Sequence, residues 1–178
     1  MIVIKRNFEK CKSKGKVGED IVVQLLKDRG WVVYNHSTDD ITHWLDLIAI
    51  KNKTNVIAID IKTKSRLTYL EATGIDTNYV EEYKQFSKEH NMPFILIFVD
   101  EVTKTIYGNT LEELEKPKIV GNKEYPDLMP TQYGKIVKLW HLSSMKKIAN
   151  LSDDDVKLLK ELSTRNYDYP NKKTTNIL

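Results

Sequence analysis

The segment from Val56 to Lys62, VIAIDIK, constrains the fold of this chain more than any other segment. Side chains of a β-strand alternate between the two faces of a sheet, so three isoleucines share one face while Asp60 and Lys62 share the other. A carboxylate and an ammonium are each costly to bury alone, so both need partners at the end of an apolar strand. A divalent cation and a phosphate would satisfy them. The segment therefore predicts a buried strand that carries a polar site.

Length and composition indicate one globular domain. The 178 residues can bury a sizeable core, and a chain that is 40% apolar and 30% charged is typical of folded proteins. The single cysteine, Cys11, excludes an internal disulfide framework and a cysteine-based zinc site, and it fits a reducing cytosol. The apolar run at the N-terminus is too short for a signal peptide, and no apolar stretch reaches the length of a membrane span. We therefore expect a cytoplasmic protein without a membrane partner.

The basic residues are concentrated in the first part of the chain. Residues 1–70 carry 13 Lys and Arg against 8 Asp and Glu, whereas residues 71–178 carry 15 against 17. An excess of positive charge around the polar site would suit an anionic polymer such as DNA. A solvated, lysine-rich surface explains the charge alone equally well.

Hydrophobic periodicity and turn residues predict a mixed α/β order of elements. The first helix is expected over Ser13–Arg29 and a second over Thr77–His90, with Gly74 marking a turn before it. Tyr79 and Tyr83 of the second helix are expected to be core or rim residues, and the alternative is that they face the site. The strands are expected at Trp31–Tyr34, Leu45–Ile50, Val56–Lys62, the FILIFV run after Pro93, and Thr103–Tyr107. The second and third strands form a predicted hairpin. Together these elements predict a central mixed sheet flanked by helices.

The C-terminal third has weaker signals. Residues 111–129 are charged and contain prolines and a glycine, which predicts irregular structure. A strand is expected over Lys135–Leu142, and Ser152 followed by three aspartates is typical of a helix start. We expect a core of residues 1–110 and a C-terminal extension, residues 111–178, packed on the same domain, with a poorly ordered tail from about residue 166.

Four residues form the candidate site: Glu19, Asp46, Asp60 and Lys62. Asp46 lies in the apolar segment HWLDLIAI, where an acid needs a partner. Glu19 lies on the first predicted helix, where the simplest alternative is an exposed acid of its first turn. For Asp60 and Lys62 the alternative is a structural ion pair.

The segments GKVGEDIV, WLDLIAI and IDIKTK, in this order, resemble the PD-(D/E)XK nuclease superfamily, which has the restriction-endonuclease-like fold and includes archaeal Holliday-junction resolvases. The resemblance covers residues 13–108 and implies an αβββαβ core, which agrees with the predicted order of elements. Two positions depart from the family pattern. The third-strand acid is Asp60 rather than the more frequent Glu, and Leu45 replaces a proline.

The resemblance also implies a role for each site residue. Mg²⁺, for which Mn²⁺ can substitute, would be bound by Asp46, Asp60 and the backbone carbonyl of Ile61, with Glu19 acting through a water molecule. Lys62 would orient the attacking water or help to deprotonate it. Hard cations prefer such oxygen ligands, and phosphodiester hydrolysis needs negative charge to be neutralised at the phosphate.

Basic residues beside this site are candidates for contacts with DNA phosphates. They precede Glu19 or follow Lys62 in the sequence: Lys12, Lys14, Lys16, Lys64 and Arg66. For Lys64 and Arg66, solvated basic residues are the alternative. The chain contains no P-loop, dinucleotide fingerprint or zinc-ligand spacing.

The sequence therefore predicts a Mg²⁺-dependent endodeoxyribonuclease that recognises DNA structure or backbone, of the resolvase-like or the phage and mobile-element type. A homodimer is expected, because symmetric cleavage of two strands calls for two sites. Two other hypotheses remain open. One is a catalytically silent protein of this fold that binds nucleic acid or a protein partner, and the other is an interaction protein in which Asp60 and Lys62 form only an ion pair.

Overall fold

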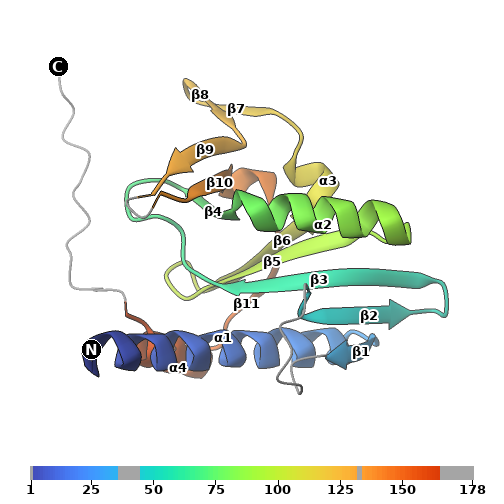
Figure 1. The fold of residues 1–178 in the computed structure, drawn as a ribbon. Helices are drawn as coiled ribbons and strands as arrows, with labels where there is room; N and C mark the ends of the chain where they lie inside the picture. The colour runs from blue at the N-terminus through green and yellow to red at the C-terminus, as the bar shows by residue number, and fades with distance from the viewer. Residues whose placement is uncertain (1, 36–44, 132–133, 165–178) are drawn as a thin grey trace.

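A computed structural model describes residues 2–35, 45–131 and 134–164. The central six-stranded sheet has the strand order β1-β2-β3-β5-β6-β11, and a second sheet has the order β4-β10-β9. Figure 1 shows α1 (Ile2–Asp28) and α4 (Asp153–Leu162) on one side of the central sheet and α2 (Thr77–His90) on the other. This arrangement confirms the predicted mixed sheet flanked by helices.

Three antiparallel strands form one part of the central sheet: β1 (Val32–Asn35), β2 (Leu47–Lys51) and β3 (Asn55–Thr63). The predicted hairpin of β2 and β3 is present, with Leu47 opposite Ile59. Strand β5 (Phe94–Asp100) then runs parallel to β3, and β6 (Thr105–Thr110) runs antiparallel to β5. Parallel strands need a crossover connection, and the connection from β3 to β5 contains α2, which packs on one face of the sheet.

Each face of the central sheet has its own apolar core. The first core contains Ile59 and Ile61 of β3 and packs under Val22 of α1 and Leu159 of α4. The isoleucine face of the VIAIDIK segment is therefore the face that the two helices cover. The second core lies under α2, where the rings of Tyr83 and Phe94 stack with centroids 4.3 Å apart. Asp60 belongs to this second face, by the alternation of side chains along β3.

The ends of α2 follow from its flanking residues. The side chain of Asp76 accepts a hydrogen bond from the amide of Asn78 and caps the first turn, while Asn91 adopts the left-handed conformation that ends the helix. The predicted range Thr77–His90 is therefore confirmed at both ends. Helix α1 is longer than predicted, since it begins at Ile2 rather than at Ser13.

The predicted turn at Gly74 is wrong. Gly74 lies in strand β4 (Ala72–Asp76), directly opposite Leu139 of β10 (Ile136–His141). A Cβ atom at Gly74 would lie 1.9 Å from the carbonyl oxygen of Lys138, so the glycine is required by a close approach of two strands. A local sequence pattern does not show such a contact, because the two strands that make it are far apart in the sequence.

The prediction of irregular structure over residues 111–129 is also wrong in part. This segment forms short elements: α3 (Leu111–Leu114), β7 (Lys118–Val120), β8 (Lys123–Tyr125) and β9 (Asp127–Pro130). Strands β7 and β8 form a separate hairpin, and β9 pairs with β10. Their brevity explains why no periodicity marks them.

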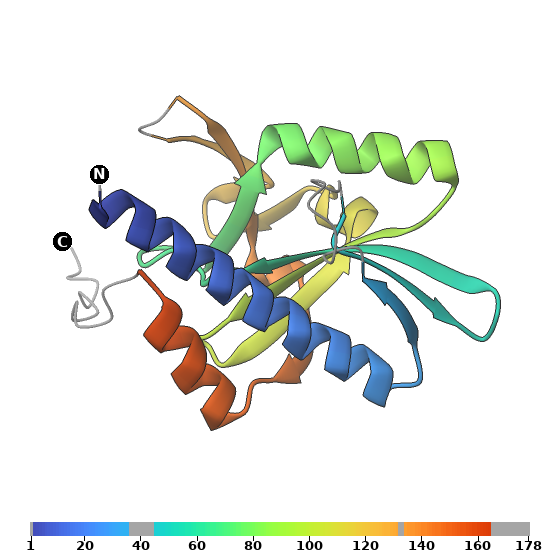
Figure 2. The same ribbon diagram turned by 60° about the horizontal axis from the view of Figure 1, so that its bottom comes forward.

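The C-terminal part completes the central sheet. After β10 and a short 3₁₀ helix (Leu142–Ser144), strand β11 (Lys146–Asn150) pairs with β6 at the edge of the sheet. Helix α4 begins with a capping box between Ser152 and Asp155 and lies beside α1, as Figure 2 shows. The strand and the helix predicted for this region are both present. The predicted poorly ordered tail falls mainly on residues 165–178, which lie outside the described residues.

Candidate functional site

Asp60 and Lys62 lie two positions apart near the end of β3. The Asp60 side chain is buried, with the residue 2% exposed, and its Oδ1 accepts a hydrogen bond from Lys62 Nζ at 2.8 Å. Its second oxygen, Oδ2, is buried without a hydrogen bond of ordinary geometry within the described residues. An ion pair that serves only structure would leave this buried oxygen unsatisfied, which is costly. A bound cation would satisfy it.

Asp46 reaches the same point from the neighbouring strand. It lies just before β2, where its amide donates to the carbonyl of Ile59 at 3.1 Å. Its Oδ2 accepts a hydrogen bond from the Ile61 amide at 2.6 Å, so its carboxylate is held against β3 between Asp60 and Lys62. The hairpin thus brings together two acids and a lysine that are up to 16 positions apart in the sequence.

The electrostatics of Asp46 reflect this crowding. Burial and the neighbouring Asp60 carboxylate raise the pKa of Asp46 to about 7, although the Ile61 amide and the Lys62 charge act in the opposite direction. For Lys62, burial alone would lower the pKa. The Asp60 carboxylate and the hydrogen bond to it outweigh burial and raise the pKa of Lys62 above its usual value, so the ammonium stays charged.

Glu19 approaches from α1, which crosses the end of β3 at very short range. A Cβ atom at Gly18 would lie 1.8 Å from Thr63 Oγ1, so glycine at this position lets the helix come close to the strand. Burial raises the pKa of Glu19, the nearby Lys16 opposes the shift, and weaker contributions come from Asp20, Lys62 and Asp60. Glu19 therefore lies within electrostatic range of the β3 residues.

The donor set fits a hard divalent cation held by two carboxylates. Within the described residues, no group of three or more His, Cys, Asp or Glu side chains is placed to hold a metal ion. Mg²⁺ commonly binds through one or two carboxylates and keeps several waters, so the pair is a sufficient protein contribution. The unsatisfied Asp60 Oδ2 and the raised pKa of Asp46 are both features that a bound cation would relieve.

Helix α2 adds two residues that the sequence assigned by default to the core or rim, with an orientation toward the site as the alternative. Tyr83 is buried, and its pKa is raised by burial first and then by the charge of Asp60 and a hydrogen bond to it. Tyr79 lies one turn earlier, and its ring centroid is 5.7 Å from Lys62 Nζ. The i, i+4 spacing of the two tyrosines indicates that they share one face of the helix. The direction in which this face points depends on tertiary packing and is not given by the spacing.

The predicted DNA-contacting residues occupy different environments. Lys12 is exposed on α1, and Lys16 is exposed and pairs with Asp20 at 3.1 Å. Lys64 donates to the carbonyl of Gly74 at 2.6 Å, and its pKa is lowered by burial of the ammonium and by the Lys62 charge. Arg66 Nη1 lies 3.8 Å from Glu71 Oε1.

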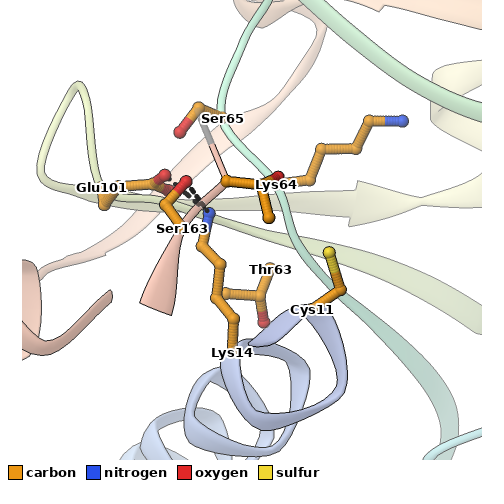
Figure 3. Close-up of a pocket in the computed structure, with 8 residues that line it drawn as sticks. Cys11, Lys14, Thr63, Lys64, Ser65, Glu101 and Ser163 are labelled. Carbon is orange, nitrogen blue, oxygen red and sulfur yellow. Dashed lines mark hydrogen bonds and ion pairs between the residues drawn. The ribbon is translucent and has the colours of Figure 1, made fainter. Parts of the chain in front are cut away.

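Lys14, a predicted DNA-phosphate contact, has a mostly buried side chain. Its Nζ lies 2.6 Å from Oε1 of the fully buried Glu101, and Figure 3 shows this pair beside Ser163 in a cavity of about 410 Å³. The cavity is also lined by Cys11, Thr63 and Lys64. The ion pair with Glu101 gives Lys14 a structural role at the junction of α1 with the loop after β5.

Within the described residues, no helix is both long enough and apolar enough to span a membrane.

Two of the solved structures to which this chain is similar are nucleases. The chain is similar to Archaeoglobus fulgidus Hjc, a Holliday junction resolvase from an archaeal hyperthermophile, with 15% identity and a TM-score of 0.50 over 76% of this chain and 93% of the resolvase. It is also similar to D212, a nuclease from a fusselovirus, with 14% identity and a TM-score of 0.44 over 80% of this chain and 85% of that protein. No family model matches the sequence, and none of the curated proteins compared with it matches significantly. The likeness to the resolvase confirms the predicted restriction-endonuclease-like fold.

Proposed function

We propose that this chain, which has the fold of a resolvase, is a divalent-metal-dependent nuclease that hydrolyses DNA phosphodiester bonds. One observation carries the proposal. Asp46 and Asp60 meet across the β2–β3 hairpin beside Lys62, and among the described residues no partner of ordinary hydrogen-bond geometry reaches the buried Asp60 Oδ2. Two acids and a lysine in this arrangement suit the binding of a cation and a phosphate together.

Asp46 and Asp60 would hold Mg²⁺ or Mn²⁺, with the Ile61 carbonyl as a further oxygen and Glu19 acting through water. When bound, the cation would polarise the phosphate and favour deprotonation of the attacking water. Because the Ile61 amide fixes one Asp46 oxygen at 2.6 Å, this ligand needs little reorganisation when the ion enters.

In addition to the charge of the bound cation, the side chain of Lys62 supplies a positive charge at the site. Its ammonium is held at 2.8 Å from Asp60 Oδ1, and its raised pKa keeps it charged throughout the neutral range. A fixed cation beside the scissile phosphate stabilises the charge that develops in the transition state, and it can orient the attacking water. Part of the Lys62 side chain is exposed, which leaves the ammonium accessible to a substrate.

We infer that the DNA backbone reaches this site across the exposed lysines of α1 and the half-buried Arg66 after β3. Lys12 and Lys16 are exposed on α1, and Arg66 follows β3. Phosphate contacts of this kind position DNA without reading its sequence, so affinity should fall steeply with salt. Two copies of the chain acting together would provide one site for each strand of a duplex.

The proposal is tested by incubating the protein with linear, nicked, flapped and four-way DNA in the presence of Mg²⁺ or Mn²⁺. We expect cleavage of at least one substrate, and its loss with EDTA and in Asp60→Asn. Asparagine preserves the size of the side chain and removes the charge that binds the ion. If the wild-type protein cleaves none of these substrates but binds DNA as tightly as Asp60→Asn does, the chain is a silent DNA-binding protein of this fold.

A further inference from the structure

Three aromatic rings form a stack that runs from the core of the protein to the surface beside Lys62. The innermost ring is Phe94 of β5, which stacks on Tyr83 with centroids 4.3 Å apart and an interplanar angle of 12°. Tyr83 stacks in turn on Tyr79 with centroids 6.3 Å apart and an angle of 23°. Phe94 and Tyr83 are each 2% exposed, whereas Tyr79 is 47% exposed. The stack therefore ends in an aromatic ring that is open to solvent.

Positive charges surround this outer ring. Lys62 Nζ lies over the ring, 5.7 Å from its centroid. Lys135, which is largely exposed and pairs with Asp76 at 3.0 Å, also lies within electrostatic range of Tyr79. A partly exposed aromatic ring beside lysines is the combination by which proteins bind single-stranded nucleic acid, because a base stacks on the ring while phosphates contact the cations.

We propose that Tyr79 is a stacking platform for an unpaired nucleobase adjacent to the phosphodiester bound at Asp46, Asp60 and Lys62. This inference rests on the proposed nuclease function and specifies its substrate. A base within a continuous duplex must first leave its own stack, whereas a base that is already unpaired can add to the aromatic stack directly. Tyr79 thus selects strands with an unpaired nucleotide next to the cleaved bond, with little preference for the identity of that base.

A narrower role is also consistent with the geometry, since Tyr79 could serve only to hold the Lys62 ammonium by a cation–π contact. The two roles differ when Lys62 is absent. A platform for a base still works in Lys62→Met, whereas a residue that only positions Lys62 then has nothing left to contribute. Substitution of Tyr79 in both backgrounds therefore separates them.

The test uses a short single-stranded oligothymidine with one 2-aminopurine at successive positions, whose fluorescence is quenched when this base stacks. Binding is measured in EDTA, so that the readout does not depend on cleavage. We expect quenching at one or two positions with wild-type protein, with Tyr79→Phe, which retains the ring, and with Lys62→Met. Tyr79→Leu should abolish this quenching and weaken binding roughly 5- to 100-fold in the wild-type and Lys62→Met backgrounds.

Tyr69→Leu is the matched control for loss of an exposed tyrosine. Tyr69 is more exposed than Tyr79, and its hydroxyl contacts the Met129 sulfur. The proposal is overturned if Tyr69→Leu and Tyr79→Leu have equal effects, if quenching survives in Tyr79→Leu, or if Tyr79→Leu has no effect once Lys62 is methionine. Failure of the nuclease proposal appears separately, as absence of metal-dependent cleavage by a protein that still quenches the probe through Tyr79.

Discussion

The carboxylate of Asp46 is hydrogen-bonded to the backbone amide of Ile61 at 2.6 Å, between the two β3 residues with which it forms the candidate site. This contact ties a residue that precedes one strand to the backbone of the next strand. It therefore couples the geometry of the site to the register of the β2–β3 hairpin, in which Leu47 lies opposite Ile59. A shift of one position would move Asp60 and Lys62 to the isoleucine face.

The raised pKa of Asp46 predicts a specific dependence of stability on pH. Because the folded-state pKa of about 7 exceeds the ordinary value of 3.8, the folded protein binds an extra proton between these values, and its stability falls as the pH rises through this window. Asp46→Asn removes the charge and can still accept the hydrogen bond from Ile61. We expect this variant to be more stable than wild type at pH 8, by at most about 4 kcal/mol, with little difference at pH 4.

Urea unfolding at pH 4, 6 and 8 in EDTA measures this difference. The destabilisation contributed by Asp46 is absent below the unfolded-state pKa and complete above the folded-state pKa, so the gap between the two proteins should open across that interval. Added Mn²⁺ at pH 8 should stabilise wild type more than Asp46→Asn, because a ligand that binds only the folded state adds to its stability. A gap that stays constant with pH would show that Asp46 is not a crowded acid.

The close approach of α1 to β3 predicts opposite effects at two glycines of the same helix. A Cβ atom at Gly18 would lie 1.8 Å from Thr63 Oγ1, whereas one at Gly15 would meet nothing within 4 Å. We expect Gly18→Ala to lower the free energy of unfolding by about 1–3 kcal/mol through overpacking. Gly15→Ala should raise it by about 0.5–1 kcal/mol, because alanine favours the helix.

Thermal and urea unfolding of the two variants check this difference directly. Displacement of α1 would also move Glu19, so Gly18→Ala should reduce cleavage by more than its loss of stability explains, whereas Gly15→Ala should cleave normally. Equal effects of the two substitutions on stability would contradict the described packing of α1 on β3.

Two lysines that precede Glu19 should behave differently although both lie on α1. Lys14 pairs with the buried carboxylate of Glu101 at 2.6 Å, and Lys12 is exposed. Lys14→Met removes one partner of a buried ion pair and should destabilise the protein by roughly 3 kcal/mol. Lys12→Met should leave stability nearly unchanged, and it should weaken DNA binding and reduce the salt dependence of binding.

Unfolding by urea and DNA binding at several salt concentrations separate these roles. Addition of Glu101→Gln to Lys14→Met should recover part of the lost stability, because the buried carboxylate no longer needs a counterion. If Lys14→Met weakens DNA binding without loss of stability, Lys14 contacts DNA as the sequence first suggested.

Local patterns were sufficient for much of the fold. The alternation in VIAIDIK placed Asp60 and Lys62 on one face, and the helical spacing of apolar residues predicted the range of α2, because both features depend on neighbouring residues. The strand β4 was missed because Gly74 is explained only by its contact with Lys138, a residue 64 positions away. The pair of Lys14 and Glu101, separated by 87 positions, was hidden for the same reason.

The candidate site was predictable in part. Its acids and lysine stand in apolar segments where unpaired charges are costly, and this physical conflict is visible in the sequence. The sequence left open whether Tyr79 and Tyr83 face the site, because this depends on how α2 is rotated against the sheet.

Single-turnover cleavage by wild type and by Asp60→Asn, measured across a range of Mn²⁺ concentrations, tests the central claim most directly. The substrate is the most rapidly cleaved DNA of the panel, with protein in excess. We predict that the wild-type rate rises with Mn²⁺ and saturates, whereas Asp60→Asn binds the DNA but is slower by several orders of magnitude at every concentration, because it lacks a charged ligand for the ion. Cleavage by Asp60→Asn at the wild-type rate would contradict the account, since the reaction would then occur elsewhere than at Asp46, Asp60 and Lys62.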